Sequence, residues 1–176
     1  MHSITLALLL LFSTWADTSQ NHVWQEFTSA EGKFSALMPD KPTTSFILTN
    51  TPRGVVQTYT VSSAYEGNSY LVSWTEYKQE SVEHKATEKT FDMIRDALVA
   101  DKNGKVLSDS PITLEGHPAR AVTYTTEDGM TVMARFYFIK NRFYQVMAER
   151  RGPTDSGAAE RFLNSFRIVK GSLLVF

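Results

Sequence analysis

The stretch that decides the fold is MTVMARFYFIKNRFYQVMAER, residues 130–150. Its two arms, residues 130–140 and 143–150, are rich in Val, Ile, Phe, Tyr and Met, which favour β-strands. The arms meet at Asn141 and Arg142, and Asn tolerates the positive φ that tight hairpins need. The pattern therefore predicts a β-hairpin.

Apolar residues occur on both faces of the first arm of this hairpin. Successive side chains of a strand point to opposite faces. One face carries Met130, Val132, Ala134, Phe136 and Phe138, and the other carries Met133, Tyr137 and Ile139. Because a strand that is apolar on both sides must be covered on both sides, we expect the hairpin near the middle of a sheet, between two further layers.

The rest of the chain contains strand-like and helix-like segments. Alternation between turn residues predicts strands over residues 23–27, 34–38, 43–48, 55–64, 69–77, 106–114 and 119–125. Apolar residues at helical spacing predict a first helix within 87–103 and a short second helix around Phe162 and Phe166. If these helices supply the covering layers, the fold is α+β: an α/β/α sandwich with a central, mainly antiparallel twisted sheet flanked by helices.

The N-terminus resembles an export signal. Residues 4–12 form an apolar run of the length found in signal peptides, well short of the roughly 20 residues of a membrane-spanning helix. Thr14 and Ala16 place small residues at the −3 and −1 positions of a cleavage site. We therefore expect a signal peptide over 1–16 and a single domain over 17–176, with no membrane span after leader removal. The alternative is that the run is an apolar helix or strand of the domain.

Composition excludes several classes of function. The 18 basic and 19 acidic residues leave a net charge of −1, so nothing predicts a nucleic-acid partner. The chain has no Cys, which rules out disulfides, a thiol nucleophile and a lipid anchor on an N-terminal Cys. It also has no N-x-[ST] glycosylation sequon. We expect an exported bacterial protein, periplasmic or extracellular.

Several segments resemble a known family. Near the start these are Trp24, Phe27, Ser29 to Gly32, Phe34-Ser35, Met38-Pro39 and Pro42, and near the end Ala159 to Leu163 with Ser165-Phe166. This pattern resembles the PsbP-like families of exported bacterial proteins and spans nearly the whole mature chain. The resemblance implies an α/β/α sandwich and an accessory role. Photosynthetic members carry metal sites built from clustered His and carboxylates, and this sequence has no matching cluster.

Motifs for catalysis are absent from the sequence. The four histidines, His2, His22, His84 and His117, include no pair at i, i+4 or H-x-H spacing that would hold a metal. No G-x-S-x-G motif offers a nucleophilic serine. Convergence of Ser110, His117 and Asp128 in space is the remaining catalytic alternative. We expect no enzyme activity, no metal and no cofactor.

One aromatic group is the candidate site. It consists of Tyr59, Tyr65, Tyr70, Trp74 and Tyr77. These side chains either line a groove for a partner or a small apolar ligand, or form core and cross-strand pairs of a covered sheet. The core interpretation is favoured, because aromatic residues in strands are more often packed than exposed.

The resulting functional hypothesis is a non-enzymatic binding or assembly accessory module of the bacterial cell envelope or periplasm. Its expected partner is an envelope protein or a small apolar ligand. The alternative is a small-molecule or lipid carrier that uses a groove between helix and sheet.

Overall fold

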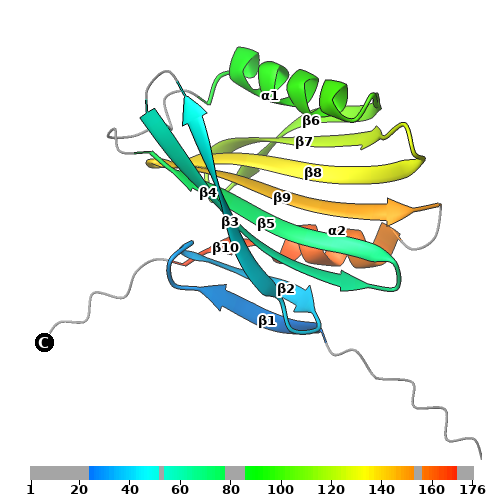
Figure 1. Cartoon of the computed structure of the whole chain (residues 1–176), viewed down its shortest axis with the longest axis horizontal. Coiled ribbons are helices and arrows are strands. Elements are labelled where there is room, and N and C mark those ends of the chain that lie inside the picture. Colours follow the sequence, from blue (N-terminus) through cyan, green and yellow to red (C-terminus); the bar gives the residue numbers. More distant parts are fainter. Residues whose placement is uncertain (1–23, 52–53, 78–85, 153–155, 170–176) are drawn as a thin grey trace, which may run out of the picture.

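The computed structural model describes residues 24–51, 54–77, 86–152 and 156–169, of which about 63% lie in strands. These residues form ten strands in two antiparallel sheets, together with two helices (Figure 1). The elements are β1 (Trp24–Ser29), β2 (Phe34–Pro39), β3 (Thr43–Thr51), β4 (Gly54–Tyr65), β5 (Asn68–Glu76), α1 (Glu88–Asp101), β6 (Lys105–Leu114), β7 (His117–Thr125), β8 (Met130–Ile139), β9 (Arg142–Arg151), α2 (Ser156–Ser165) and β10 (Arg167–Ile168).

The predicted hairpin lies inside a seven-stranded sheet with the order β3-β4-β5-β9-β8-β7-β6. β8 and β9 pair from Met130↔Arg151 to Ile139↔Arg142. The turn between them falls one residue earlier than predicted, because Lys140 carries the positive φ of 55°. Most of β9 is buried, and core clusters lie on both faces of the hairpin. The predicted central position of this hairpin is therefore confirmed.

Helix α1 covers one face of the large sheet. Its Phe91 is 1% exposed and lies in a core cluster with residues of β7, β8 and β9. Thr87 caps the helix by accepting a hydrogen bond from the Thr90 N–H. At the other end, a Cβ on Gly104 would lie 2.3 Å from the carbonyl oxygen of Thr125, so only glycine fits where the helix turns into β6.

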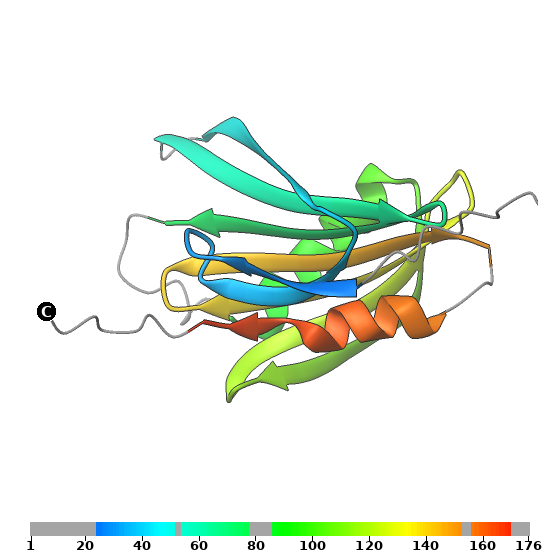
Figure 2. The same ribbon diagram turned by 90° about the horizontal axis from the view of Figure 1, so that it is seen from below.

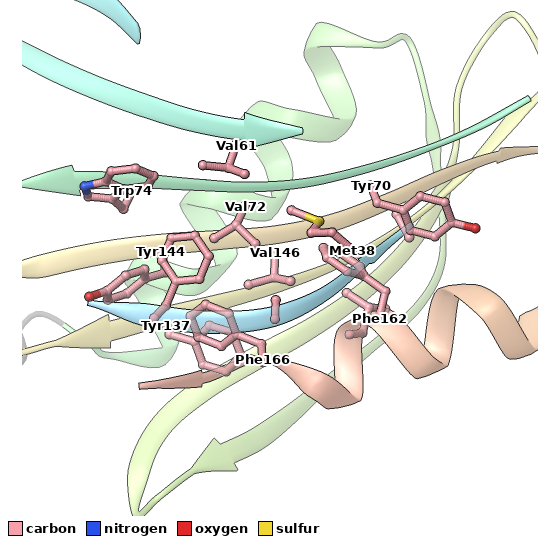
Figure 3. Packing of buried hydrophobic residues seen from close by; sticks show 14 of the residues in the cluster. Met38, Val61, Tyr70, Val72, Trp74, Tyr137, Tyr144, Val146, Phe162 and Phe166 are labelled. Carbon is pink, nitrogen blue, oxygen red and sulfur yellow. The ribbon is translucent and has the colours of Figure 1, made fainter. Parts of the chain in front are cut away.

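A small sheet and α2 cover the opposite face. The small sheet has the order β1-β2-β10 and lies in front of the large sheet in the view of Figure 2. Its buried residues Phe34 and Met38 meet Phe162 and Phe166 of the α2 segment and the aromatic residues of β5, β8 and β9 in one cluster (Figure 3). This is the larger of the two cores.

The predicted α/β/α sandwich is wrong. The expected helical contacts exist, with Phe91 on one face and Phe162 on the other, but helices do not supply the covering layers alone. The opening hairpin forms a separate sheet, because β2 finds backbone partners in β1 and β10 while its apolar face turns toward the large sheet. The fold is therefore mostly β. The predicted signal peptide, 1–16, lies outside the described residues.

Candidate functional site

Strand β3 forms one edge of the large sheet and is exposed along nearly its whole length. It pairs with β4 from Thr43↔Ser62 to Thr51↔Gly54. No described strand pairs with its outer side, so alternate N–H and C=O groups of β3 point away from the sheet. Eight of its nine residues are exposed. We call Thr43–Thr51 the β3 edge; it lies at the outside of the molecule (Figure 2).

Local sequence explains why the chain extends here. Asp40 takes a φ of 59°, and its carboxylate accepts a hydrogen bond from the Lys41 N–H, which turns the chain out of β2. β-branched Thr and Ile residues then favour a strand. At the far end the Thr51 hydroxyl donates to the Gly54 carbonyl over 2.7 Å, and Gly54 takes a φ of 112°. The β3–β4 hairpin is thus fixed at both ends by its own residues.

Three consecutive apolar side chains are exposed at the centre of the β3 edge. Phe46, Ile47 and Leu48 are 58%, 63% and 62% exposed, and Val55 on the adjacent β4 is 61% exposed. By strand alternation, Phe46 and Leu48 lie on the face that carries the small sheet, and Ile47 lies on the face that carries α1. Apolar surface is therefore available on both sides of this edge.

A row of aromatic rings connects the edge to the core. The ring centroids of Phe46 and Tyr59 are 6.1 Å apart. Tyr59 in turn stacks on Trp74, with 5.0 Å between the ring centroids and an interplanar angle of 10°. Trp74 is 2% exposed and contacts Phe34 of the small sheet at 5.6 Å. The exposed ring of Phe46 is consequently connected, through Tyr59, to the buried ring of Trp74.

Polar contacts hold Tyr59 in place. A hydrogen bond with the Glu31 side chain, assisted by burial and by the negative charges of Glu31 and Glu76, raises the pKa of Tyr59. Burial alone would raise the pKa of Glu76, but hydrogen bonds from Asn141 and Arg142 outweigh it, so this pKa is lowered. The phenol of Tyr59 therefore stays a neutral hydrogen-bond donor.

Arg142 anchors the turn of the small sheet to the large sheet. It is 6% exposed and donates to the Glu31 carbonyl and to the Glu76 carboxylate, both at 2.7 Å. The Tyr144 hydroxyl donates to the Gly32 carbonyl at 2.9 Å. These contacts fix where the small sheet lies over β5 and β9.

The opposite edge of the large sheet is built differently. β6 contains Pro111, which lacks an N–H donor, together with charged Lys105 and Asp109. Its register with β7 shifts between Val106 and Ser108, which marks a bulge or irregularity. Proline, charge and bulges are the features that keep strand edges from pairing with other chains.

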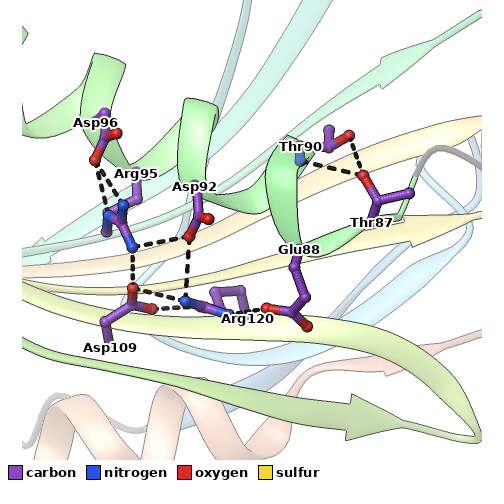
Figure 4. Close-up of polar contacts among 8 residues, drawn as sticks. All are labelled: Thr87, Glu88, Thr90, Asp92, Arg95, Asp96, Asp109 and Arg120. Atoms are coloured by element: carbon purple, nitrogen blue, oxygen red, sulfur yellow. Dashed lines mark hydrogen bonds and ion pairs between the residues drawn. The ribbon is translucent and has the colours of Figure 1, made fainter.

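An ion-pair network fastens α1 to this second edge (Figure 4). Arg120 on β7 contacts Asp109, Glu88 and Asp92, and Arg95 on α1 contacts Asp109 as well as Asp92 and Asp96. The hydrogen bond from Arg120 lowers the pKa of Asp109, against the opposing effect of burial, and Arg95 adds to it. Because every carboxylate in the network is paired with a guanidinium, the arrangement is a structural link between α1, β6 and β7.

The structure brings together four of the five predicted aromatic residues. Tyr70 and Trp74 are 1% and 2% exposed, and Tyr59 and Tyr65 pack partly buried against the same cluster (Figure 3). Tyr77 packs against the cluster on the other face of the sheet. The five therefore do not share one face, and binding at these residues stays a prediction.

The residues that sequence reasoning missed are Phe46, Ile47 and Leu48. Their strand was predicted over 43–48, but not their exposure. The available signal was a strand with adjacent apolar residues and no charge from Thr43 to Thr51. By the rule applied to residues 130–150, that signal predicts a strand covered on both faces.

Ser110, His117 and Asp128 do not form a catalytic group. His117 begins β7, whereas Asp128 lies beyond the other end of the same strand, and Ser110 pairs with Ala121 in the middle of it. Within the described residues, no group of three His, Cys, Asp or Glu side chains could hold a metal ion. No helix in that part of the chain is long and apolar enough to cross a membrane. The chain matches no protein-family model and no curated protein.

Proposed function

We propose that the protein is a non-enzymatic binding and assembly module of the bacterial cell envelope, and that it binds an extended polypeptide segment at the β3 edge. The observation that carries this proposal is the edge strand itself. The strand has nine residues without a charge, no described strand pairs with its outer side, and three consecutive apolar side chains are exposed. Strands of this kind take up another strand readily unless something protects them.

Binding would proceed by strand addition. Each backbone hydrogen bond gained in this way contributes about 0.5 to 1.5 kcal/mol net. Burial of an exposed Leu, Ile or Phe side chain adds about 1.5 to 3 kcal/mol. Partner side chains on one face would meet Phe46 and Leu48, and those on the other would meet Ile47, so a segment with consecutive apolar residues fits best.

The proposed location follows from the N-terminal sequence. The apolar run at 4–12 is typical of a signal peptide, and on this basis we propose a periplasmic or extracellular location. A partner would then be another exported polypeptide. The PsbP-like resemblance implied the same accessory class, but the sandwich that it also implied is not the fold found, so the β3 edge alone carries the proposal.

The described core gives less support to the carrier alternative. A carrier would need free space between α1 and the sheet. Phe91 fills that position, at 1% exposure and 5.7 Å from the ring of Phe138. Binding at the outer edge is therefore the function that the geometry favours.

The test is recovery of the protein with its partner from its native envelope. A tagged chain should retain one enriched polypeptide, and the Ile47→Lys variant should lose it because an ammonium group interrupts the apolar edge. The control is Leu107→Lys on β6, where the native side chain is 56% exposed. In hydrogen exchange with purified components, the partner should protect the amides of residues 43–51. Equal recovery by wild type and Ile47→Lys would contradict the proposal.

A further inference from the structure

The sequence of the β3 edge is nearly symmetric about its central residue. Reading outward from Ile47, the flanking pairs are Phe46 with Leu48, Ser45 with Thr49, Thr44 with Asn50, and Thr43 with Thr51. Each pair joins residues of the same kind: two large apolar side chains, then three pairs of small polar ones. The strand is therefore complementary to an antiparallel copy of itself.

We propose that the partner segment is the β3 edge of a second copy of this chain, an inference that rests on the proposed function. The two edges would pair antiparallel around a two-fold axis that passes through Ile47. In that register Ile47 lies opposite its counterpart, and Phe46 lies opposite Leu48 of the partner subunit. The two large sheets then join into one continuous antiparallel sheet.

Side-chain alternation supports this register. Residues directly opposite each other in an antiparallel pair lie on the same face of the sheet. Phe46 and the partner's Leu48 therefore meet on the face where Tyr59 and Val55 already border them. The two Ile47 side chains meet on the other face, where Ile47 pairs with Thr58. If the two-fold axis passed through Phe46 or Leu48 instead, Ile47 would lie opposite a hydroxyl side chain, that of Ser45 or Thr49.

Electrostatics places no barrier in the way of this contact. Residues 43–51 carry no charge, so no like charges face each other across the two-fold axis. The whole chain has a net charge of only −1, which leaves little long-range repulsion between copies.

Pairing of this kind stops at two copies. A two-fold contact uses the same edge of both subunits, so it leaves no second β3 edge exposed. The remaining free edges of the joined sheet are the two β6 strands, which carry Pro111, Asp109 and an irregular register. A single pair of strands buries less than the roughly 1,200 to 2,000 Å² of stable complexes. We therefore expect a reversible dimer with a Kd on the order of 10 µM.

The first experiment measures the mass of the purified full chain in solution across a concentration series. The wild type should move from one toward two copies as concentration rises through the micromolar range. Ile47→Lys places two ammonium groups on the two-fold axis and should weaken association about 100-fold or more. Leu107→Lys, with the same charge change on β6, should associate like the wild type.

The second experiment tests the register. Because the chain has no native Cys, a single introduced thiol reports on one position. Residues opposite each other in an antiparallel pair have Cα atoms about 4.5 to 5.5 Å apart, within disulfide range. Ile47→Cys should therefore crosslink two copies under mild oxidation. Thr49→Cys should not, because its counterpart would lie opposite Ser45 and out of reach.

The outcomes separate this inference from the proposed function. Dimerisation lost in Ile47→Lys, together with selective crosslinking at position 47, supports both. A chain that stays monomeric yet gains protection at 43–51 from another envelope protein overturns the dimer and leaves the binding module standing. A monomer without any edge partner overturns both. A dimer that Ile47→Lys does not weaken also overturns the inference.

Discussion

The two edges of the large sheet differ in almost every property that controls contact with other chains. β3 has no charge, no proline and no register shift, and nothing described covers it. β6 has Pro111, Asp109 and an irregularity, and the Arg120 network ties α1 to it. One sheet therefore has a protected edge and an unprotected one. The comparison indicates that an exposed edge is not a general feature of this sheet, because only β3 lacks the protective features that β6 carries.

The largest expected effect on stability is at Trp74, the buried end of the aromatic row. Phe46, the exposed end on β3, should show a much smaller effect. Trp74→Ala should lower the free energy of unfolding by about 3 to 5 kcal/mol, because it empties a core position. Phe46→Ala should lower it by less than about 1 kcal/mol, because the ring is exposed in the single chain. Urea unfolding at low protein concentration measures both. Similar losses for the two variants would mean that the β3 edge is covered within one chain.

A second prediction concerns the network at the protected edge. Arg120→Met should destabilise the protein by about 2 kcal/mol, because Asp109 loses its main partner while 14% of its side chain is exposed. Arg151→Met is the matched control. Arg151 lies 4.0 Å from Asp128 and both side chains are well exposed, so the expected loss is under about 0.5 kcal/mol. Equal losses at the two arginines would show that the network does not fasten α1.

The pH dependence of stability offers a sharper test of that network. Since its pKa is lowered in the folded state, Asp109 contributes stability that is present above the ordinary Asp value of about 3.9 and is lost as the pH falls below it. The hydrogen bond from Arg120 is the largest cause of this shift. Arg120→Met should therefore lose less stability than the wild type between about pH 5 and pH 3. Parallel urea midpoints across that range would contradict the assignment.

The smallest expected effect is at the unprotected edge. Ile47→Lys should change the free energy of unfolding of the single chain by no more than about 0.5 kcal/mol, because the Ile47 side chain is 63% exposed. Its cross-strand neighbour is Thr58, which is not part of an apolar cluster. Chemical unfolding below the Kd of the dimer measures this change. A clear loss of stability there would mean that Ile47 packs against part of its own chain.

Much of the large sheet could be predicted from the sequence, because local pattern determines it. Residues 130–150 are apolar on both faces, and this signature correctly placed β8 and β9 inside the sheet. Likewise the helix predicted within 87–103 contains α1, since helical spacing and the cap at Thr87 are local features of the sequence.

The small sheet and the β3 edge could not be predicted in the same way. Phe46-Ile47-Leu48 has the same local signature as the central strands, yet it is exposed because β3 comes last in the strand order. Strand order is set by contacts between segments that are distant in the sequence, so it cannot be deduced from a short stretch of residues. For the same reason, the pairing of Phe34 with Ile168 could not be read from either segment alone.

The hydrogen bond between β2 and α2 has a consequence for how the chain folds. The Leu37 N–H donates to the Ser165 hydroxyl, which lies 128 residues further along the chain. β10 then pairs with β2, and the Val169 N–H donates to the Lys33 carbonyl. The core that contains Phe34 and Met38 therefore lacks Phe162 and Phe166 until more than 120 further residues have been made. The small sheet and its core therefore form through contacts of high sequence separation, which close slowly, whereas the core around Phe91 contains no residue of α2 or β10.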